Sequence, residues 1–149
     1  MRLKITLILA VIAVAAAGCG AIGRVTSGNP YVGKQLFVQK CGACHTLANA
    51  KTTGTVGPNL DYAFGPVKQQ GFHLSTITDL VRGQIEIPDT NPGVAEPACP
   101  GGCPGMTPNL LHGQDAKDVA VYVGLCAAVT NCDVKNATYS IDDGKYEGS

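Results

Sequence analysis

The chain has 149 residues, equal numbers of basic and acidic residues (11 each) and no tryptophan. This length predicts one domain, and the lack of a basic cluster argues against a nucleic-acid-binding protein. The chain contains five tyrosines and three phenylalanines. So few large apolar side chains predict that a buried cofactor or disulfides help to complete the core.

The N-terminus has the features of an export signal. Arg2 and Lys4 form a short basic start, and residues 5–17 are almost entirely apolar. This run of 13 residues is shorter than a membrane-spanning helix and typical of a signal peptide. It ends in Ala-Ala-Gly directly before Cys19, which resembles a bacterial lipoprotein signal covering residues 1–18, with the lipid attached at Cys19. An ordinary secretory signal with Cys19 incidental is the alternative, and both alternatives predict export.

The first part of the exported chain is expected to contain one helix between two irregular segments. Residues 19–29 are small and polar, which is typical of a flexible tether. Pro30 is well placed in the first turn of a helix that reaches about residue 40. Residues 46–71 contain four glycines and two prolines, and we expect them to be mostly loop.

The middle of the chain combines a helix with a long loop. Apolar residues at helical spacing predict a helix over residues 76–84, and Thr76 and Asp79 match a capping box at its start. Residues 86–108 are so rich in proline and glycine that we expect no regular element there. A loop of this length needs something that orders it, and a cofactor meets that need.

The last helix is expected over residues 115–127, whose apolar side chains recur at helical spacing. Residues 129–149 are polar and weakly patterned, and we expect a frayed tail there. The domain proper therefore covers residues 30–128, and its pattern predicts an all-α fold with three main helices.

The motif Cys41-Gly-Ala-Cys44-His45 carries the clearest chemistry. Two cysteines at this spacing can each add to a haem vinyl group, and the following histidine is then the proximal ligand of the iron. A redox-active pair of cysteines belongs in a βαβ setting, and no strand is expected here. A zinc site needs a second pair at suitable spacing, which Cys99 and Cys103 do not provide.

Met106 is the candidate for the second axial ligand. It is the one methionine that remains after the signal peptide is removed, and it lies in the turn Pro-Gly-Met-Thr-Pro. A methionine that merely fills a core gap is expected on an apolar helix face instead. Paired imidazole and thioether ligands raise the potential of haem iron. His73 or His112 as the sixth ligand is the alternative.

These residues together resemble the class I (mitochondrial-type) cytochromes c, over residues 30–128. In that family a loop on the proximal side carries a proline whose carbonyl accepts a hydrogen bond from the ligand histidine. Thr55-Val-Gly-Pro-Asn-Leu60 is similar to this loop. The resemblance implies that Pro58 fixes the His45 tautomer, and it places Met106 in the distal loop.

The resemblance also implies a particular helix packing. In the family the N-terminal and C-terminal helices cross, with a glycine and an aromatic residue meeting an aromatic residue. Here that implies Gly33 and Phe37 against Tyr122. The expected fold is the cytochrome c fold, in which three main helices surround one covalently bound haem c and the distal loop is long.

Two features depart from the family. The ring of lysines around the haem edge in well-known eukaryotic members is missing, and without Arg2 and Lys4 the net charge is 9 − 11 = −2. Four cysteines also remain after lipid and haem attachment. In an oxidising compartment they predict two disulfides with three possible pairings, with free thiols as the alternative. Proximity in sequence favours Cys99–Cys103 and Cys126–Cys132.

The expected function is single-electron transfer, not enzymatic catalysis, because both axial positions of the iron are filled. We expect a lipid anchor on the outer face of the cytoplasmic membrane, with a quinol-oxidising complex and a terminal oxidase or reductase as redox partners. An electron-accepting subunit of a dehydrogenase or oxidase complex is the first alternative, and a haem peroxidase or gas-binding protein is the second. The expected apolar envelope of the haem is Leu36, Leu60, Phe64, Leu80 and Leu110.

Overall fold

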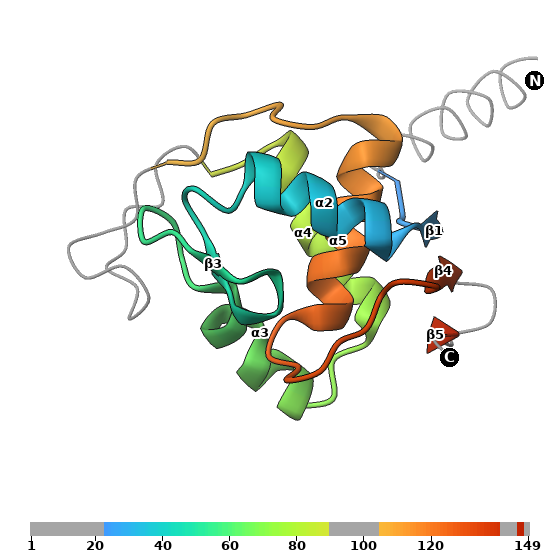
Figure 1. Ribbon diagram of the computed structural model, residues 1–149. Coiled ribbons are helices and arrows are strands. Elements are labelled where there is room, and N and C mark those ends of the chain that lie inside the picture. The colour runs from blue at the N-terminus through green and yellow to red at the C-terminus, as the bar shows by residue number, and fades with distance from the viewer. Residues whose placement is uncertain (1–22, 90–104, 141–145, 148–149) are drawn as a thin grey trace, which may run out of the picture.

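The computed structural model describes residues 23–89, 105–140 and 146–147, and these form a mainly helical fold (Figure 1). Its α-helices are α2 (Pro30–Lys40), α3 (Leu60–Gln69), α4 (Leu74–Glu86) and α5 (Gly113–Cys126). One small antiparallel sheet has the order β1-β4-β5, made of β1 (Ser27–Gly28), β4 (Thr138–Ser140) and β5 (Tyr146–Glu147). A second pairs β2 (Thr46–Leu47) with β3 (Thr52–Thr53), on either side of a 3-10 turn at Ala48–Ala50.

No helix within the described ranges is long and apolar enough to cross a bilayer. The expected signal peptide with Cys19, and the expected pair Cys99 and Cys103, lie outside these ranges.

Helix α2 begins and ends as its sequence predicts. The Asn29 side chain accepts hydrogen bonds from two backbone N–H groups of the first turn, at 3.0 and 3.2 Å, and Pro30 occupies a first-turn position where no N–H is needed. At the other end, the N–H of Cys41 donates to the carbonyl of Phe37 at 2.8 Å. The helix therefore delivers the chain directly into the Cys41–His45 motif.

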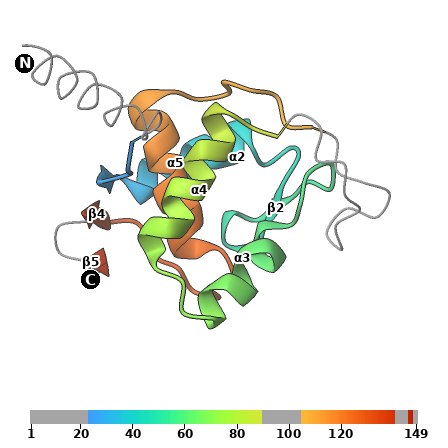
Figure 2. The same ribbon diagram turned by 180° about the vertical axis from the view of Figure 1, so that it is seen from behind.

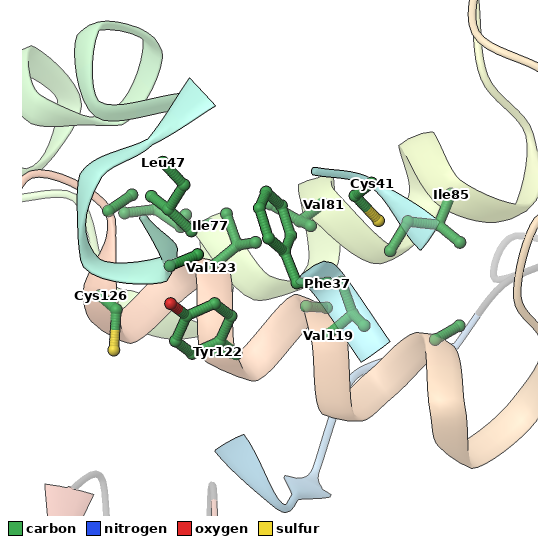
Figure 3. Packing of buried hydrophobic residues seen from close by; sticks show 14 of the residues in the cluster. Phe37, Cys41, Leu47, Ile77, Val81, Ile85, Val119, Tyr122, Val123 and Cys126 are labelled. Atoms are coloured by element: carbon green, nitrogen blue, oxygen red, sulfur yellow. The ribbon is translucent and has the colours of Figure 1, made fainter. Parts of the chain in front are cut away.

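Helices α2 and α5 cross at a glycine, as expected. A Cβ atom on Gly33 would lie 2.9 Å from Tyr122 Cβ and would overlap the Asp118 carbonyl. Without that atom the two backbones approach closely, and the Phe37 and Tyr122 rings meet edge to face with centroids 5.9 Å apart (Figure 3). Both rings are fully buried. This crossing is the centre of the core.

Substituting Gly33→Val should lower the free energy of unfolding by about 3 kcal/mol, because the added side chain forces α2 away from α5. Chemical denaturation followed by far-UV circular dichroism measures this loss. The control is Gln35→Ala, an exposed position of the same helix, where a change within about 0.5 kcal/mol is expected. Equal stability of Gly33→Val and Gln35→Ala would contradict the close crossing.

Helix α4 packs along the other side of α5 (Figure 2). Its buried face consists of Ile77, Thr78, Val81 and Ile85. A Cβ atom on Gly124 of α5 would lie 2.7 Å from a methyl carbon of Thr78, so this contact is also close. Helices α2, α4 and α5 overlap the three helices expected from the sequence, and α3 is a fourth, unexpected helix that packs against the same core.

The capping box expected at the start of α4 is wrong. The helix begins at Leu74, two residues before Thr76, and His73 stands at the N-cap without a side-chain hydrogen bond. The Asp79 carboxylate instead accepts a hydrogen bond from the N–H of Val25 at 2.6 Å. A tertiary contact with the N-terminal segment therefore occupies the side chain that the local pattern assigned to a cap.

Helix α3 occupies part of the segment expected to be loop. The Asn59 side chain caps it by accepting the N–H of Asp61 at 2.9 Å, and Leu60, Phe64 and Val67 recur at helical spacing. Pro66 lies inside the helix and removes one backbone donor. The ten-residue helix tolerates the loss of this donor because its apolar side chains, Leu60, Phe64 and Val67, pack against the core.

The expected flexible tether and frayed tail also differ from the structure. Val25 is fully buried, and β1 pairs with β4 with Gly28 opposite Tyr139. Val25, Val121 and Tyr139 form a second apolar cluster beside α5. Each segment looks polar alone, but together they cover a helix face that the three-helix core leaves open.

Candidate cofactor-binding site

A cavity of about 520 Å³ lies between α2, α3, α4 and α5. This volume is in the usual range for ligand and cofactor sites. Cys41, His45, Pro58 and Met106 all line it, which brings together residues from three separate parts of the sequence. The rest of the lining is mostly apolar and includes Phe37, Leu60, Phe64, Val67, Leu80 and Val123.

Cys41 lies at the inner wall of the cavity. It is 7% exposed, at the C-terminal end of α2, and Figure 3 shows it near Val81 and Ile85 of α4. Burial raises the pKa of the Cys41 thiol to about 11, with a smaller contribution from Cys44. A reactive redox cysteine has a lowered pKa and often stands at a helix N-terminus, so Cys41 lacks both features.

Cys44 is exposed and is not among the residues that line the cavity. It lies in the turn between α2 and β2, where its N–H donates to the Cys41 carbonyl at 3.0 Å. The two cysteines are therefore in different environments, one in the apolar wall and one at the surface. Of the two, only Cys41 lines the cavity.

The His45 ring is oriented by the segment that follows β3. Its Nδ1 atom lies 2.9 Å from the carbonyl oxygen of Pro58, which accepts the hydrogen bond. This is the contact expected from the resemblance. With Nδ1 as the donor, Nε2 is left with its lone pair, which is the form that binds a metal ion.

Two glycines, Gly54 and Gly57, lie against the His45 turn, and neither was expected from the sequence to have a role. A Cβ atom on Gly57 would lie 2.5 Å from His45 Cε1, so the backbone of Gly57 lies flat against the imidazole. A Cβ atom on Gly54 would lie 2.6 Å from the Ala43 carbonyl oxygen. The position of Gly57 next to Pro58 is the signal that could have identified it.

Met106 reaches the cavity from the segment before α5. Its side chain is half-buried and packs against the main core cluster, as well as lining the cavity. His73 and His112 are both exposed and stand at the N-caps of α4 and α5, and neither lines the cavity. Among the three candidates for a second axial ligand, the geometry therefore favours Met106.

The expected apolar envelope agrees with the cavity only in part. Leu60, Phe64 and Leu80 line it, and Leu36 packs against the core cluster beside it. Leu110 does not line it and is 38% exposed.

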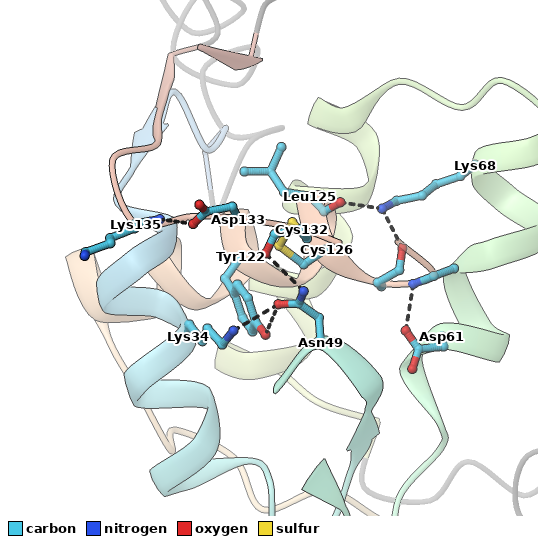
Figure 4. Close-up of a disulfide and its surroundings, with 12 residues drawn as sticks. Lys34, Asn49, Asp61, Lys68, Tyr122, Leu125, Cys126, Cys132, Asp133 and Lys135 are labelled. Carbon is cyan, nitrogen blue, oxygen red and sulfur yellow. Dashed lines mark hydrogen bonds between the residues drawn. A yellow bond between two sulfur atoms is a disulfide. The ribbon is translucent and has the colours of Figure 1, made fainter. Parts of the chain in front are cut away.

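Cys126 and Cys132 lie at disulfide-bonding distance, with the sulfur atoms 1.96 Å apart (Figure 4). The pair closes the turn between the end of α5 and the C-terminal segment. Figure 3 shows Cys126 at the opposite end of the core cluster from Cys41. This is the pairing that proximity favoured for these two residues.

Replacing both by serine should lower the free energy of unfolding by about 2 kcal/mol, the loop-closure term for so short a separation. Equilibrium denaturation measures the loss. Alkylation of the native protein without reductant should label no cysteine. Stoichiometric labelling of Cys126 or Cys132 would contradict the pairing.

The donor set of the cavity fits a covalently held haem. The Cys41 thiol, the His45 imidazole and the Met106 thioether line the cavity, and Pro58 holds the imidazole. A second thiol that could form a thioether, that of Cys44, lies outside the lining, in the turn that leads to His45. Because Gly57 has no Cβ atom, its backbone leaves room for the His45 imidazole ring, which a Cβ atom would displace. Within the described residues, no group of three or more His, Cys, Asp or Glu side chains could hold a metal ion.

Comparison of the sequence with models of known protein families finds no match.

Proposed function

We propose that the protein is an exported monohaem c-type cytochrome that carries single electrons. The observation that carries this proposal is the meeting of Cys41, His45 and Met106 on one apolar cavity. The Cys-x-x-Cys-His spacing supplies the attachment chemistry, and the hydrogen bond from His45 to Pro58 supplies the required tautomer. Haem iron, when bound there, supplies one-electron chemistry.

The residues of the cavity have separate tasks in this proposal. Cys41 and Cys44 would hold the haem covalently, and His45 and Met106 would be the ligands of its iron. The apolar side chains keep water away and lower the local dielectric, which favours the less charged ferrous form. Phe37 and Val123, each 1% exposed, form the inner part of this wall.

Electron transfer is favoured over catalysis at the iron. An enzyme or a gas-binding protein needs an open or displaceable axial position. Here an imidazole and a thioether line the same cavity, so the proposal leaves no site for a substrate. The carrier then works by brief docking with a redox partner, in an interface of small area.

The lipid anchor at Cys19 is part of the proposal. It would confine the protein to the outer face of the cytoplasmic membrane, near a quinol-oxidising complex and a terminal oxidase or reductase. A net charge near −2 and the lack of a lysine cluster favour a second candidate, a haem-bearing subunit held in one such complex. A partner that co-purifies at fixed stoichiometry would support the role of a subunit in a complex. Purification without such a partner would support the role of a carrier that moves between complexes.

Visible spectra of the membrane fraction test the proposal. The oxidised and reduced forms should show the bands of a six-coordinate c-type haem, and carbon monoxide should leave the reduced spectrum unchanged. Rapid binding of carbon monoxide would favour the peroxidase or gas-binding alternative. Lack of any haem spectrum in correctly exported protein would contradict the proposal.

A further inference from the structure

The turn closed by Cys126 and Cys132, here called the disulfide turn (residues 126–132), contacts the segment that carries the candidate haem ligands. Three side chains of residues 45–69 reach it (Figure 4). Asn49 Nδ2 donates to the Cys132 carbonyl at 3.0 Å. Lys68 Nζ donates to the carbonyl of Ala127 at 2.7 Å, and also to that of Leu125, directly before the turn, at 2.9 Å. The third contact is made by Asp61.

Asp61 is the residue that joins the two regions. One oxygen of its carboxylate accepts the N–H of Ala128, in the disulfide turn, at 2.7 Å. The other accepts the N–H of Ala48, three residues after His45, at 2.8 Å. Asp61 itself follows Pro58 by three residues. A single carboxylate therefore connects the segment after His45, the segment after Pro58 and the disulfide turn.

The disulfide turn has a conformation that needs support. Ala128 has φ +58°, which is unfavourable for a residue with a side chain. The short covalent loop and the hydrogen bond to Asp61 both hold it in this conformation, and its Cβ atom lies close to Gly65 of α3. Loss of the disulfide would therefore weaken the anchor of the Asp61 carboxylate.

We propose that Asp61, supported by the Cys126–Cys132 disulfide, is a positioning residue that holds the Pro58 carbonyl against His45 and so adjusts the reduction potential of the bound haem. This inference rests on the proposed haem site. The physical link is the hydrogen bond at Pro58. A firm bond from Nδ1–H makes the imidazole a stronger donor to iron and stabilises the ferric form. A loosened bond raises the potential.

The test measures the reduction potential of the haem protein in Asp61→Asn. An amide offers one carbonyl oxygen, so one of the two backbone N–H groups loses its acceptor. We expect the potential to rise with about a tenfold shift in the ferric–ferrous equilibrium constant, or about 59 mV for one electron. Hydrogen exchange should accelerate at whichever of the Ala48 and Ala128 amides loses its acceptor.

The matched control is Asp79→Asn. Asp79 is also a carboxylate that accepts a backbone N–H, that of Val25 at 2.6 Å, but it lies on α4 and does not join the His45 segment. It loses the same charge. A shift in the potential as large as that of Asp61→Asn would overturn the proposal, because charge or general destabilisation would then account for both.

The uncharged arm is the variant Cys126→Ser/Cys132→Ser. This variant changes no charge, so a rise in its reduction potential can come only through structure. It also tests the proposal if Asp61→Asn does not fold. Because both changes act through one contact, the shift of the combined variant should be smaller than the sum of the separate shifts. A wild-type potential in Asp61→Asn or in the serine variant would overturn the proposal. Lack of a haem spectrum in the wild-type protein would contradict the haem site itself.

Discussion

The variant Cys41→Ala/Cys44→Ala is expected to carry no covalently bound haem and to lose its cooperative unfolding transition. The reason is the size of the cavity. A cavity of about 520 Å³ that loses its occupant leaves a mostly apolar lining unpacked or in contact with water, and both lower the free energy of unfolding. Because a domain is stable by only about 5–15 kcal/mol, the loss of this packing is expected to remove the cooperative transition. Haem-stained denaturing gels and thermal unfolding measure the two effects.

The control for this result is Cys126→Ala/Cys132→Ala. It also removes two sulfur atoms, those of the Cys126–Cys132 pair, and Figure 3 shows Cys126 at the opposite end of the core cluster from Cys41. It should keep the haem stain and unfold cooperatively at a lower temperature. If Cys41→Ala/Cys44→Ala unfolds as cooperatively as this control, the cavity is not a cofactor site that the core depends on.

The second large effect is expected in Met106→Ala. The change removes the thioether from the cavity without touching Cys41, Cys44 or His45, so haem should stay attached. The absorption band of sulfur–iron ligation should disappear, the reduced form should bind carbon monoxide, and the reduction potential should fall. Oxidised and reduced spectra with a potentiometric titration measure all three.

Leu80→Ala provides the matched control for Met106→Ala. Leu80 lines the same cavity and its truncation also removes an apolar side chain, but it offers no ligand atom. Its sulfur–iron band should remain and carbon monoxide should not bind. A wild-type protein without the band would make the assignment of Met106 wrong, and a bis-histidine site would then need His73 or His112 to move.

The helix crossing was expected through the resemblance to the class I cytochromes c, which implies that Gly33 and Phe37 of one helix meet Tyr122 of another, and the structure contains this close approach. The contact between His45 and Pro58 was likewise implied by the resemblance, through the short motifs that contain these residues. In both cases the local pattern and the tertiary contact agree.

The glycines and prolines of residues 46–71, Gly65 and Pro66 among them, predict a loop, but helix α3 forms within this segment. Leu60, Phe64 and Val67 recur at helical spacing, and Asn59 is a good N-cap. The apolar stripe packs against the core, which outweighs one missing hydrogen bond. Helix α3 therefore forms because of its position against the core, which the composition of the segment alone does not reveal.

The terminal segments and Asp61 illustrate a different limit. Val25 and Tyr139 are 114 residues apart (139 − 25), and their burial depends on each other and on Val121 of α5. The Asp61 carboxylate accepts hydrogen bonds from the N–H groups of two residues that lie 13 and 67 positions away in the sequence. Contacts of this kind leave no periodic trace in a single sequence, so only the structure reveals them.

The intact mass of the exported protein after full denaturation tests the central claim most directly. A covalently attached haem remains on the chain in denaturant, so the mass should exceed that of the processed polypeptide and its lipid by one haem. Proteolysis should then place the added mass on the peptide that contains Cys41, Cys44 and His45. A mature chain with both thiols free and no added haem would contradict the account.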